Sequence, residues 1–138
     1  MNDAEKRLVF VVEDDQEVRI STRTLLEASG YSVREFASGE DVIAAGDAAA
    51  AGCIVLDQDL SGISGLELIR QLRADGVQTP AIMVSGNGRK LVAAATNAGI
   101  DAVLHKPISA AALEQWLEQI FSSKPHAASD SPGRAPSV

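Results

Sequence analysis

The sequence predicts an α/β fold in which a doubly wound, five-stranded parallel sheet carries helices on both faces. Strand-like and helix-like stretches alternate in units of about 20 to 25 residues, which is typical of βα repeats. The central strand-like stretches are unbroken apolar runs, as strands buried on both faces require. Four of the five strand-like stretches, the second excepted, are followed by a charged or hydroxyl residue. Because parallel strands place their carboxyl ends along one edge, these residues are expected to converge.

Five strand-like stretches are expected, and each can be placed in the sheet. They cover residues 8–12, 31–36, 53–56, 81–84 and 102–105. The first, third and fourth are unbroken apolar runs and suit the centre, whereas the second alternates and suits an edge. With right-handed crossovers, this pattern predicts the flavodoxin-like strand order 2-1-3-4-5, in which the first and third strands are neighbours.

The helices are predicted from their start and stop signals. They are expected after the first acidic cluster up to Gly30, after the cap Ser38, over residues 65–73, over residues 90–98, and after the cap Ser109. The alanine-rich stretch to residue 51 can be helical or irregular. The last helix repeats apolar residues at the spacing of one helix face.

Length and composition indicate one globular domain. The chain has 138 residues, of which 46% are hydrophobic and 22% are charged. Its net charge of -7 argues against non-specific binding to nucleic acid or anionic lipid. No apolar run reaches the roughly 20 residues of a membrane-spanning helix. The amino terminus does not resemble a signal peptide and Cys53 is the single cysteine, so the cytoplasm is the expected compartment.

The final stretch of the chain differs in composition from the rest. Residues 122–138 are rich in Ser, Pro, Ala and Gly and show no periodicity. They are predicted to be a disordered tail without an output domain, which leaves residues 1–121 as the folded domain.

Acidic, hydroxyl and ammonium side chains follow the predicted strands. Glu13 and Asp14 follow the first strand and Asp57 ends the third. Such a cluster of carboxylates is tolerated mainly where a hard cation such as Mg²⁺ joins them. A carboxylate can also accept a phosphoryl group, and Asp57 is the expected acceptor because it alone ends a central strand with the others around it. Ser85 and Lys106 are expected to neutralise the transferred group.

Four motifs together resemble the receiver domain of two-component response regulators. They are FVVEDD at residues 10–15, LDQDLSGISGLEL at 56–68, VSG at 84–86 and HKP at 105–107. The resemblance covers residues 7–121. It implies that a sensor histidine kinase or a histidine phosphotransfer protein phosphorylates Asp57. The domain would not be an enzyme, but would take part in its own Mg²⁺-dependent phosphorylation and dephosphorylation.

The resemblance also implies roles for individual residues. Asp14 would bind Mg²⁺ or Mn²⁺ directly, Glu13 through water, and Asp59 through its backbone carbonyl, beside Asp57. Ser85 would contact the phosphoryl group and Lys106 would pair with it. Asp15, just beyond the acid pair, is interpreted as a helix cap, and the Lys106-Pro107 bond is expected to be cis.

Departures from the family pattern affect the expected output. Val103 stands where the family usually has an aromatic residue, so its common rotating switch is missing. Ser61 replaces a common proline, which should leave the loop after the acceptor less rigid. Asp59 and Asn87 occupy two positions that influence hydrolysis of the acyl phosphate in the family, so the phosphorylated lifetime is expected to depend on both.

The preferred interpretation is a stand-alone receiver that acts in a phosphorelay. Phosphorylation would bias the loop after Ser85 and the surface of the fourth helix, fifth strand and fifth helix, which could also form a homodimer. The signal would pass to an unidentified protein target, without direct binding to nucleic acid or membrane.

Two alternatives use the same residues. A phosphatase of the haloacid dehalogenase type would use Asp57 and Asp59 as its D-x-D motif, but that family places this motif first and its acid pair last. A pseudo-receiver would keep the fold without phosphorylation, and a metal titration would address it.

Overall fold

Five parallel strands form the centre of the structure, a computed structural model that describes residues 7–130 and the side chains of residues 7–122. They are β1 (Leu8–Val12), β2 (Ser32–Phe36), β3 (Cys53–Asp57), β4 (Ala81–Ser85) and β5 (Ala102–His105). All neighbouring pairs are parallel and the order is β2-β1-β3-β4-β5, which confirms the predicted topology. The weakly patterned β2 lies at an edge, as expected.

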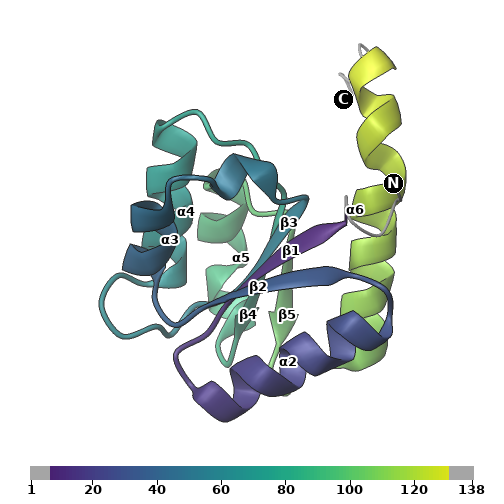
Figure 1. Ribbon diagram of the computed structural model, residues 1–138. Coiled ribbons are helices and arrows are strands. Elements are labelled where there is room, and N and C mark those ends of the chain that lie inside the picture. The colour runs from purple at the N-terminus through teal and green to yellow at the C-terminus, as the bar shows by residue number, and fades with distance from the viewer. Residues whose placement is uncertain (1–6, 131–138) are drawn as a thin grey trace.

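Helices cover both faces of this sheet (Figure 1). They are α2 (Gln16–Ala28), α3 (Gly39–Ala45), α4 (Gly65–Ala74), α5 (Gly88–Asn97) and α6 (Ala110–Asp130), with a short 3₁₀ helix, η1 (Ala48–Ala50). The first core cluster joins α3, α4 and α5 to one face of the sheet, and the second joins α2 and α6 to the other. Alternation along β1 supplies both clusters, because Phe10 and Val12 face the first whereas Val9 and Val11 face the second.

The predicted helix starts are present as hydrogen-bonded caps. Asp15 accepts hydrogen bonds from the first amides of α2, and Ser38 accepts one from the first turn of α3. Ser109 caps α6 in the same way, through the amide of Ala112. These oxygens satisfy N–H groups that lack a partner within the helix. The interpretation of Asp15 as a cap is therefore confirmed.

Helix α6 extends beyond the domain boundary expected at residue 121. It runs to Asp130, so residues 122–130 continue the helix, while residues 131–138 lie outside the described part of the chain. Once a helix has formed, each further residue adds a hydrogen bond without repeating the cost of nucleation. Within residues 7–130, no helix combines the length and the apolar character needed to cross a membrane.

Candidate functional site

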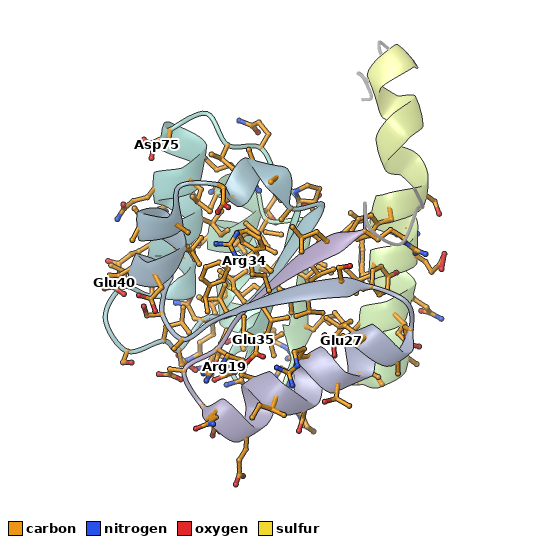
Figure 2. The ribbon with its side chains drawn as sticks, in the orientation of Figure 1. Arg19, Glu27, Arg34, Glu35, Glu40 and Asp75 are labelled. Carbon is orange, nitrogen blue, oxygen red and sulfur yellow. The ribbon has the colours of Figure 1, made fainter. Side chains whose placement is uncertain are left out.

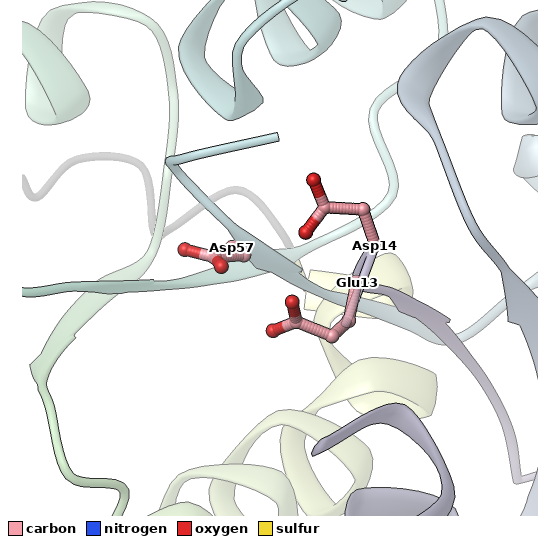
Figure 3. A group of neighbouring side chains, drawn as sticks. All are labelled: Glu13, Asp14 and Asp57. Carbon is pink, nitrogen blue, oxygen red and sulfur yellow. The ribbon is translucent and has the colours of Figure 1, made fainter. Parts of the chain in front are cut away.

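Three carboxylates meet at the carboxyl edge of the sheet. Glu13 and Asp14 follow β1, Asp57 ends β3, and these two strands are neighbours. Each residue offers a carboxylate oxygen, and these oxygens all lie within 4.8 Å of one another (Figure 3). Glu13 and Asp57 are buried, with 8% and 4% of their surface exposed, whereas Asp14 is open to solvent. The adjacent strands therefore bring together residues that are 43 positions apart in sequence, from Asp14 to Asp57.

Lys106 provides the positive charge of this cluster. Its Nζ donates a hydrogen bond to Oδ2 of Asp57 at 3.1 Å, which also makes an ion pair. The other oxygen of Asp57, Oδ1, accepts a hydrogen bond from the backbone N–H of Asp59 at 3.0 Å. The Lys106-Pro107 peptide bond is cis, as the resemblance implied. Asp57 thus has a partner on each oxygen.

Ser85 ends β4 at the same edge. Its neighbour Val84 is aligned with Asp57 in the pairing of β3 with β4, so Ser85 lies one residue beyond the acceptor. Its side chain is buried, and Oγ accepts a hydrogen bond from the backbone N–H of Asn87 at 2.9 Å. A hydroxyl that accepts in this way keeps its own O–H as a donor.

An open pocket of about 660 Å³ gives access to the cluster. Its lining includes the charged residues Glu13, Asp14, Asp57, Asp59 and Lys106. The remaining lining comes from α2 and its cap, from Val84 of β4, and from residues 107–113, which lead from β5 into α6. The pocket therefore brings solvent, an ion or a partner side chain to Asp57.

The electrostatic environment differs from one group to the next. Burial raises the pKa of Glu13 to about 7, and the neighbouring Asp57 adds to this while the N–H of Asp15 opposes it. Burial also tends to raise the pKa of Asp14, but hydrogen bonds from Ser61 outweigh it and hold that pKa below its ordinary value. Partial burial tends to lower the pKa of Lys106, but the hydrogen bond and charge of Asp57 hold it above its ordinary value.

The donor set fits a hard divalent cation. Mg²⁺ and Mn²⁺ prefer oxygen ligands, and Glu13, Asp14 and Asp57 offer three carboxylates close together. Burial is the main reason that the pKa of Glu13 is raised, repulsion from the carboxylate of Asp57 adds to it, and a cation would relieve that repulsion. Asp59 lines the same pocket, and its part in binding the cation stays a prediction.

Several residues that support the site were not predicted from the sequence. The guanidinium of Arg19 on α2 donates to the backbone carbonyl of Glu13 at 2.7 Å and pairs with Glu35 on β2 (Figure 2). Gly65 lies so close to the acceptor that a Cβ there would sit 2.5 Å from the carbonyl oxygen of Asp57. Strand and helix periodicity predict neither contact, because both depend on the path of the loop after a strand: Arg19 reaches back six residues and Gly65 eight.

Other residues singled out in the sequence lie outside this cluster. Cys53 is fully buried in β3, and burial raises the pKa of its thiol, so it is an unreactive core residue. Trp116 packs partly buried against the second core cluster. Val103, at the position of the usual aromatic residue, packs partly buried against the first.

Comparison with known proteins identifies the family. The model of the family described as "Response regulator receiver domain" matches residues 9–118. Transcriptional regulatory protein FixJ of Azorhizobium caulinodans is 40% identical over 106 residues, which are 76% of this chain and 50% of FixJ. Transcriptional regulatory protein TdiR of Thauera aromatica is 37% identical over 100 residues, which are 72% of this chain and 44% of TdiR. The chain thus spans half or less of the length of these relatives.

A solved structure agrees with the sequence relatives. The CheY-like response regulator receiver domain from Methylobacillus flagellatus is 32% identical, with a TM-score of 0.74. The alignment covers 83% of this chain and 98% of that one. With the strand order and the family match over residues 9–118, this shows that the chain belongs to the receiver domains of two-component response regulators.

Proposed function

We propose that Asp57 accepts a phosphoryl group from a histidine kinase or a histidine phosphotransfer protein, with Mg²⁺ or Mn²⁺ as cofactor. One observation supports this most: the buried carboxylate of Asp57 is bonded to Lys106 and lies beside Glu13 and Asp14. Phosphoryl transfer depends mainly on alignment and on neutralising the oxygens of the transferred group. A buried acceptor with an ammonium on one side and a cation-binding cluster on the other meets both requirements.

The proposed reaction moves a phosphoryl group from a phosphohistidine of the donor protein to Asp57. A bond forms between a carboxylate oxygen of Asp57 and phosphorus, and the phosphorus–nitrogen bond of the donor phosphohistidine breaks. The imidazole leaves with the electron pair of that bond. Attack of water on the phosphorus of the acyl phosphate later restores the carboxylate and releases inorganic phosphate. The domain is thus a phosphoacceptor rather than an enzyme that turns over an external substrate.

Each site residue has a proposed part in this reaction. Asp14 would hold the cation directly, Glu13 through water, and Asp59 through its backbone carbonyl. When bound, the cation supplies positive charge to the phosphoryl oxygens. Lys106 would pair with the phosphoryl group from the other side, and the free O–H of Ser85 would donate to it.

The signal would leave the site through the loop that leads into α5. Ser85 now accepts the amide of Asn87, and α5 begins at the next residue, Gly88. A phosphoryl group that engages the Ser85 hydroxyl would act on this loop. A Cβ at Gly88 would lie 3.3 Å from the side chain of Val103, so the loop packs closely on β5. We propose that this contact transmits the change to the surface of α5, β5 and α6 without a rotating aromatic residue.

Another molecule or segment would have to bind the phosphorylated domain for the signal to have an effect. The described residues contain the receiver fold alone, so phosphorylation would act by changing what the surface of α5, β5 and α6 binds, either a protein target or a second copy. FixJ and TdiR are transcriptional regulatory proteins, and control of a transcriptional output is one use of such a signal. We propose that this relay operates in the cytoplasm, because the chain has a single cysteine and therefore no internal disulfide that would point to an oxidising compartment.

Intact-mass measurement tests the acceptor role. The protein is incubated with acetyl phosphate and Mg²⁺, beside the Asp57→Asn variant and a sample with a chelator. We expect one added phosphoryl group in the native protein and none in either control, because the variant lacks the acceptor and the chelator removes the cation.

Phosphate-ester turnover distinguishes the phosphatase alternative. A receiver releases at most one phosphate for each phosphorylated Asp57, whereas a phosphatase hydrolyses a phosphate ester repeatedly. Multiple turnovers of an ester that stop in Asp57→Asn would contradict the proposal. A native protein that binds Mg²⁺ but gains no mass would instead favour the pseudo-receiver.

A further inference from the structure

Ser61 forms two hydrogen bonds with the carboxylate of Asp14, one of the three clustered carboxylates. Its backbone N–H donates to Oδ2 of Asp14 at 3.0 Å, and its hydroxyl donates to the same oxygen at 3.1 Å. We propose that Ser61 is a positioning residue, which holds the carboxylate of Asp14 in the orientation that binds Mg²⁺. This inference rests on the proposed function, because it concerns the same cation site.

The two hydrogen bonds from Ser61 give the two oxygens of the Asp14 carboxylate different roles. A carboxylate has two oxygens with about four lone-pair sites, and the two donors of Ser61 occupy those of Oδ2. Oδ1 is then the oxygen of Asp14 that faces a cation. Groups that hydrogen-bond to metal ligands in this way commonly orient the ligand and raise the affinity of the site.

Asp14 has particular need of such support. Glu13 and Asp57 are buried and held by their surroundings, whereas Asp14 is exposed. An exposed side chain samples several rotamers, and fixing it on binding costs conformational entropy. The bonds to Ser61 fix the side chain before the cation arrives, so less entropy is lost when it binds.

The loop that carries Ser61 is itself held on both sides. The N–H of Asp59 donates to Asp57, and the N–H of Ile63 donates to the carboxylate of Glu40 at 2.9 Å. At the start of the loop, the side chain of Gln58 accepts a hydrogen bond from the N–H of Leu66 in the first turn of α4. The loop therefore offers Asp14 a fixed support.

This geometry changes the interpretation of Ser61 made from the sequence. A serine in place of proline was expected to leave the loop less rigid, but the serine supplies two contacts that proline cannot make. Proline has neither a backbone N–H nor a hydroxyl. Ser61 thus ties the loop after Asp57 to the acid pair after β1.

Mg²⁺ affinity provides the test, independently of phosphorylation. MgCl₂ is titrated into the protein and the dissociation constant is taken from the amide resonances that shift. Ser61→Ala should weaken Mg²⁺ binding about three- to tenfold, less than the roughly 10–100-fold typical of such partners because the backbone N–H remains. Ser61→Thr should restore the native affinity, and Ser61→Pro should weaken it more than Ser61→Ala.

Ser29→Ala is the matched control. Ser29 also donates its hydroxyl to a carboxylate, that of Glu114 at 2.6 Å, but it lies at the opposite end of α2 from the cluster. Its loss should leave Mg²⁺ affinity unchanged. The amide spectrum of each variant reports directly whether the fold is intact.

The outcomes separate this inference from the proposed function. A Ser61→Ala protein that binds Mg²⁺ as tightly as Ser29→Ala, or more tightly than the native protein, overturns the positioning role while the acceptor function stands. A native protein without any saturable response to MgCl₂ overturns the cation-dependent function, and this inference with it.

Discussion

At the scale of single residues, the site is built from groups that would be unfavourable alone. Glu13 and Asp57 are carboxylates buried at the end of adjacent strands, and Lys106 compensates only part of their charge. Binding of a positive charge, either a proton or a metal ion, therefore stabilises the cluster. This stabilisation gives two predictions about individual side chains.

The first prediction concerns pH. Burial raises the pKa of Glu13 to about 7 from an ordinary value of 4.5, so the folded, metal-free protein holds this proton more tightly than the unfolded chain does. The stabilisation from this group is fully present below pH 4.5 and is lost as the pH rises toward 7. Mg²⁺ favours the ionised form, so the increase in melting temperature that it causes should be larger at pH 8 than at pH 6.

Thermal denaturation of Glu13→Gln checks this assignment. The variant has no ionisable group at this position, so its metal-free stability should vary less across the same pH range than that of the native protein. Identical pH profiles for the two proteins would show that another group is responsible.

The second prediction concerns the phosphorylated lifetime. Asp59 lines the pocket beside Asp57, and a carboxylate at this position could accept a proton from the attacking water. Asp59→Asn should therefore slow loss of the phosphoryl group, and Asn87→Glu should accelerate it. Each change should be up to about tenfold, below the roughly 10²–10⁴-fold effect of a fully aligned general base.

Decay of the phosphorylated mass after removal of the phosphodonor measures these lifetimes. Asp75→Asn is a control with the same change of charge, at the end of α4 away from the cluster (Figure 2). Native decay rates in both Asp59→Asn and Asn87→Glu would contradict the prediction that these two residues set the phosphorylated lifetime.

At the scale of elements, the start of α4 fixes the backbone around the acceptor. Ser64 and Glu67 form a reciprocal capping box, and the N–H of Gly65 donates to the carbonyl of Gln58 at 3.0 Å. The helix thus begins in direct contact with the residue that follows Asp57. Only a residue without a side chain fits at this approach.

Gly65→Ala should therefore disturb the site through the backbone. The added Cβ would lie 2.5 Å from the carbonyl oxygen of Asp57 and 3.0 Å from the Cα of Gln58, so helix or strand must shift. We expect a loss of about 1–3 kcal/mol in the free energy of unfolding. Gly86→Ala is the control, because a Cβ at Gly86 meets nothing within 4 Å.

Urea denaturation measures both glycine variants. An unfolding midpoint of Gly65→Ala equal to that of Gly86→Ala would show that α4 adjusts without strain. Reduced phosphorylation of Gly65→Ala at native secondary-structure content would locate the disturbance at the acceptor.

At the scale of the whole molecule, two core clusters hold the strand ends in place. One lies under α3, α4 and α5, and the other under α2 and α6 (Figure 1). Leu113 and Leu117 anchor α6 and are fully buried. Since β5 and α6 flank Lys106, the packing of α6 also supports the charged end of the site.

Leu117→Ala should destabilise the whole domain by about 2–5 kcal/mol, because it leaves a cavity beneath α6. Val92→Ala is the control, since half of Val92 is exposed on α5, and it should change stability by less than about 0.5 kcal/mol. Urea denaturation of the two variants measures the difference. Equal midpoints would show that α6 contributes little to the fold.

Predictions from the sequence agree best with the structure where neighbouring residues determine the secondary structure. Apolar runs, and alternation in the case of β2, predicted all five strands, and the hydroxyl and carboxylate caps Ser38, Ser109 and Asp15 start the helices as expected. The boundary at residue 121 falls inside α6, because composition does not show how far a formed helix continues. The division into a folded domain of residues 1–121 and a disordered tail of residues 122–138 stays a prediction, although α6 continues to Asp130.

The sequence by itself determined the fold, the family and the residues at the strand ends, because strand periodicity and parallel pairing bring Glu13, Asp14 and Asp57 to one edge. Only the tertiary structure decided which groups support them. The bonds from Ser61 to Asp14 and from Arg19 to Glu13 depend on loop paths and side-chain directions. The Ser61 contact spans 47 residues, and the Arg19 contact spans six but depends on the direction of its side chain, so strand and helix periodicity predict neither.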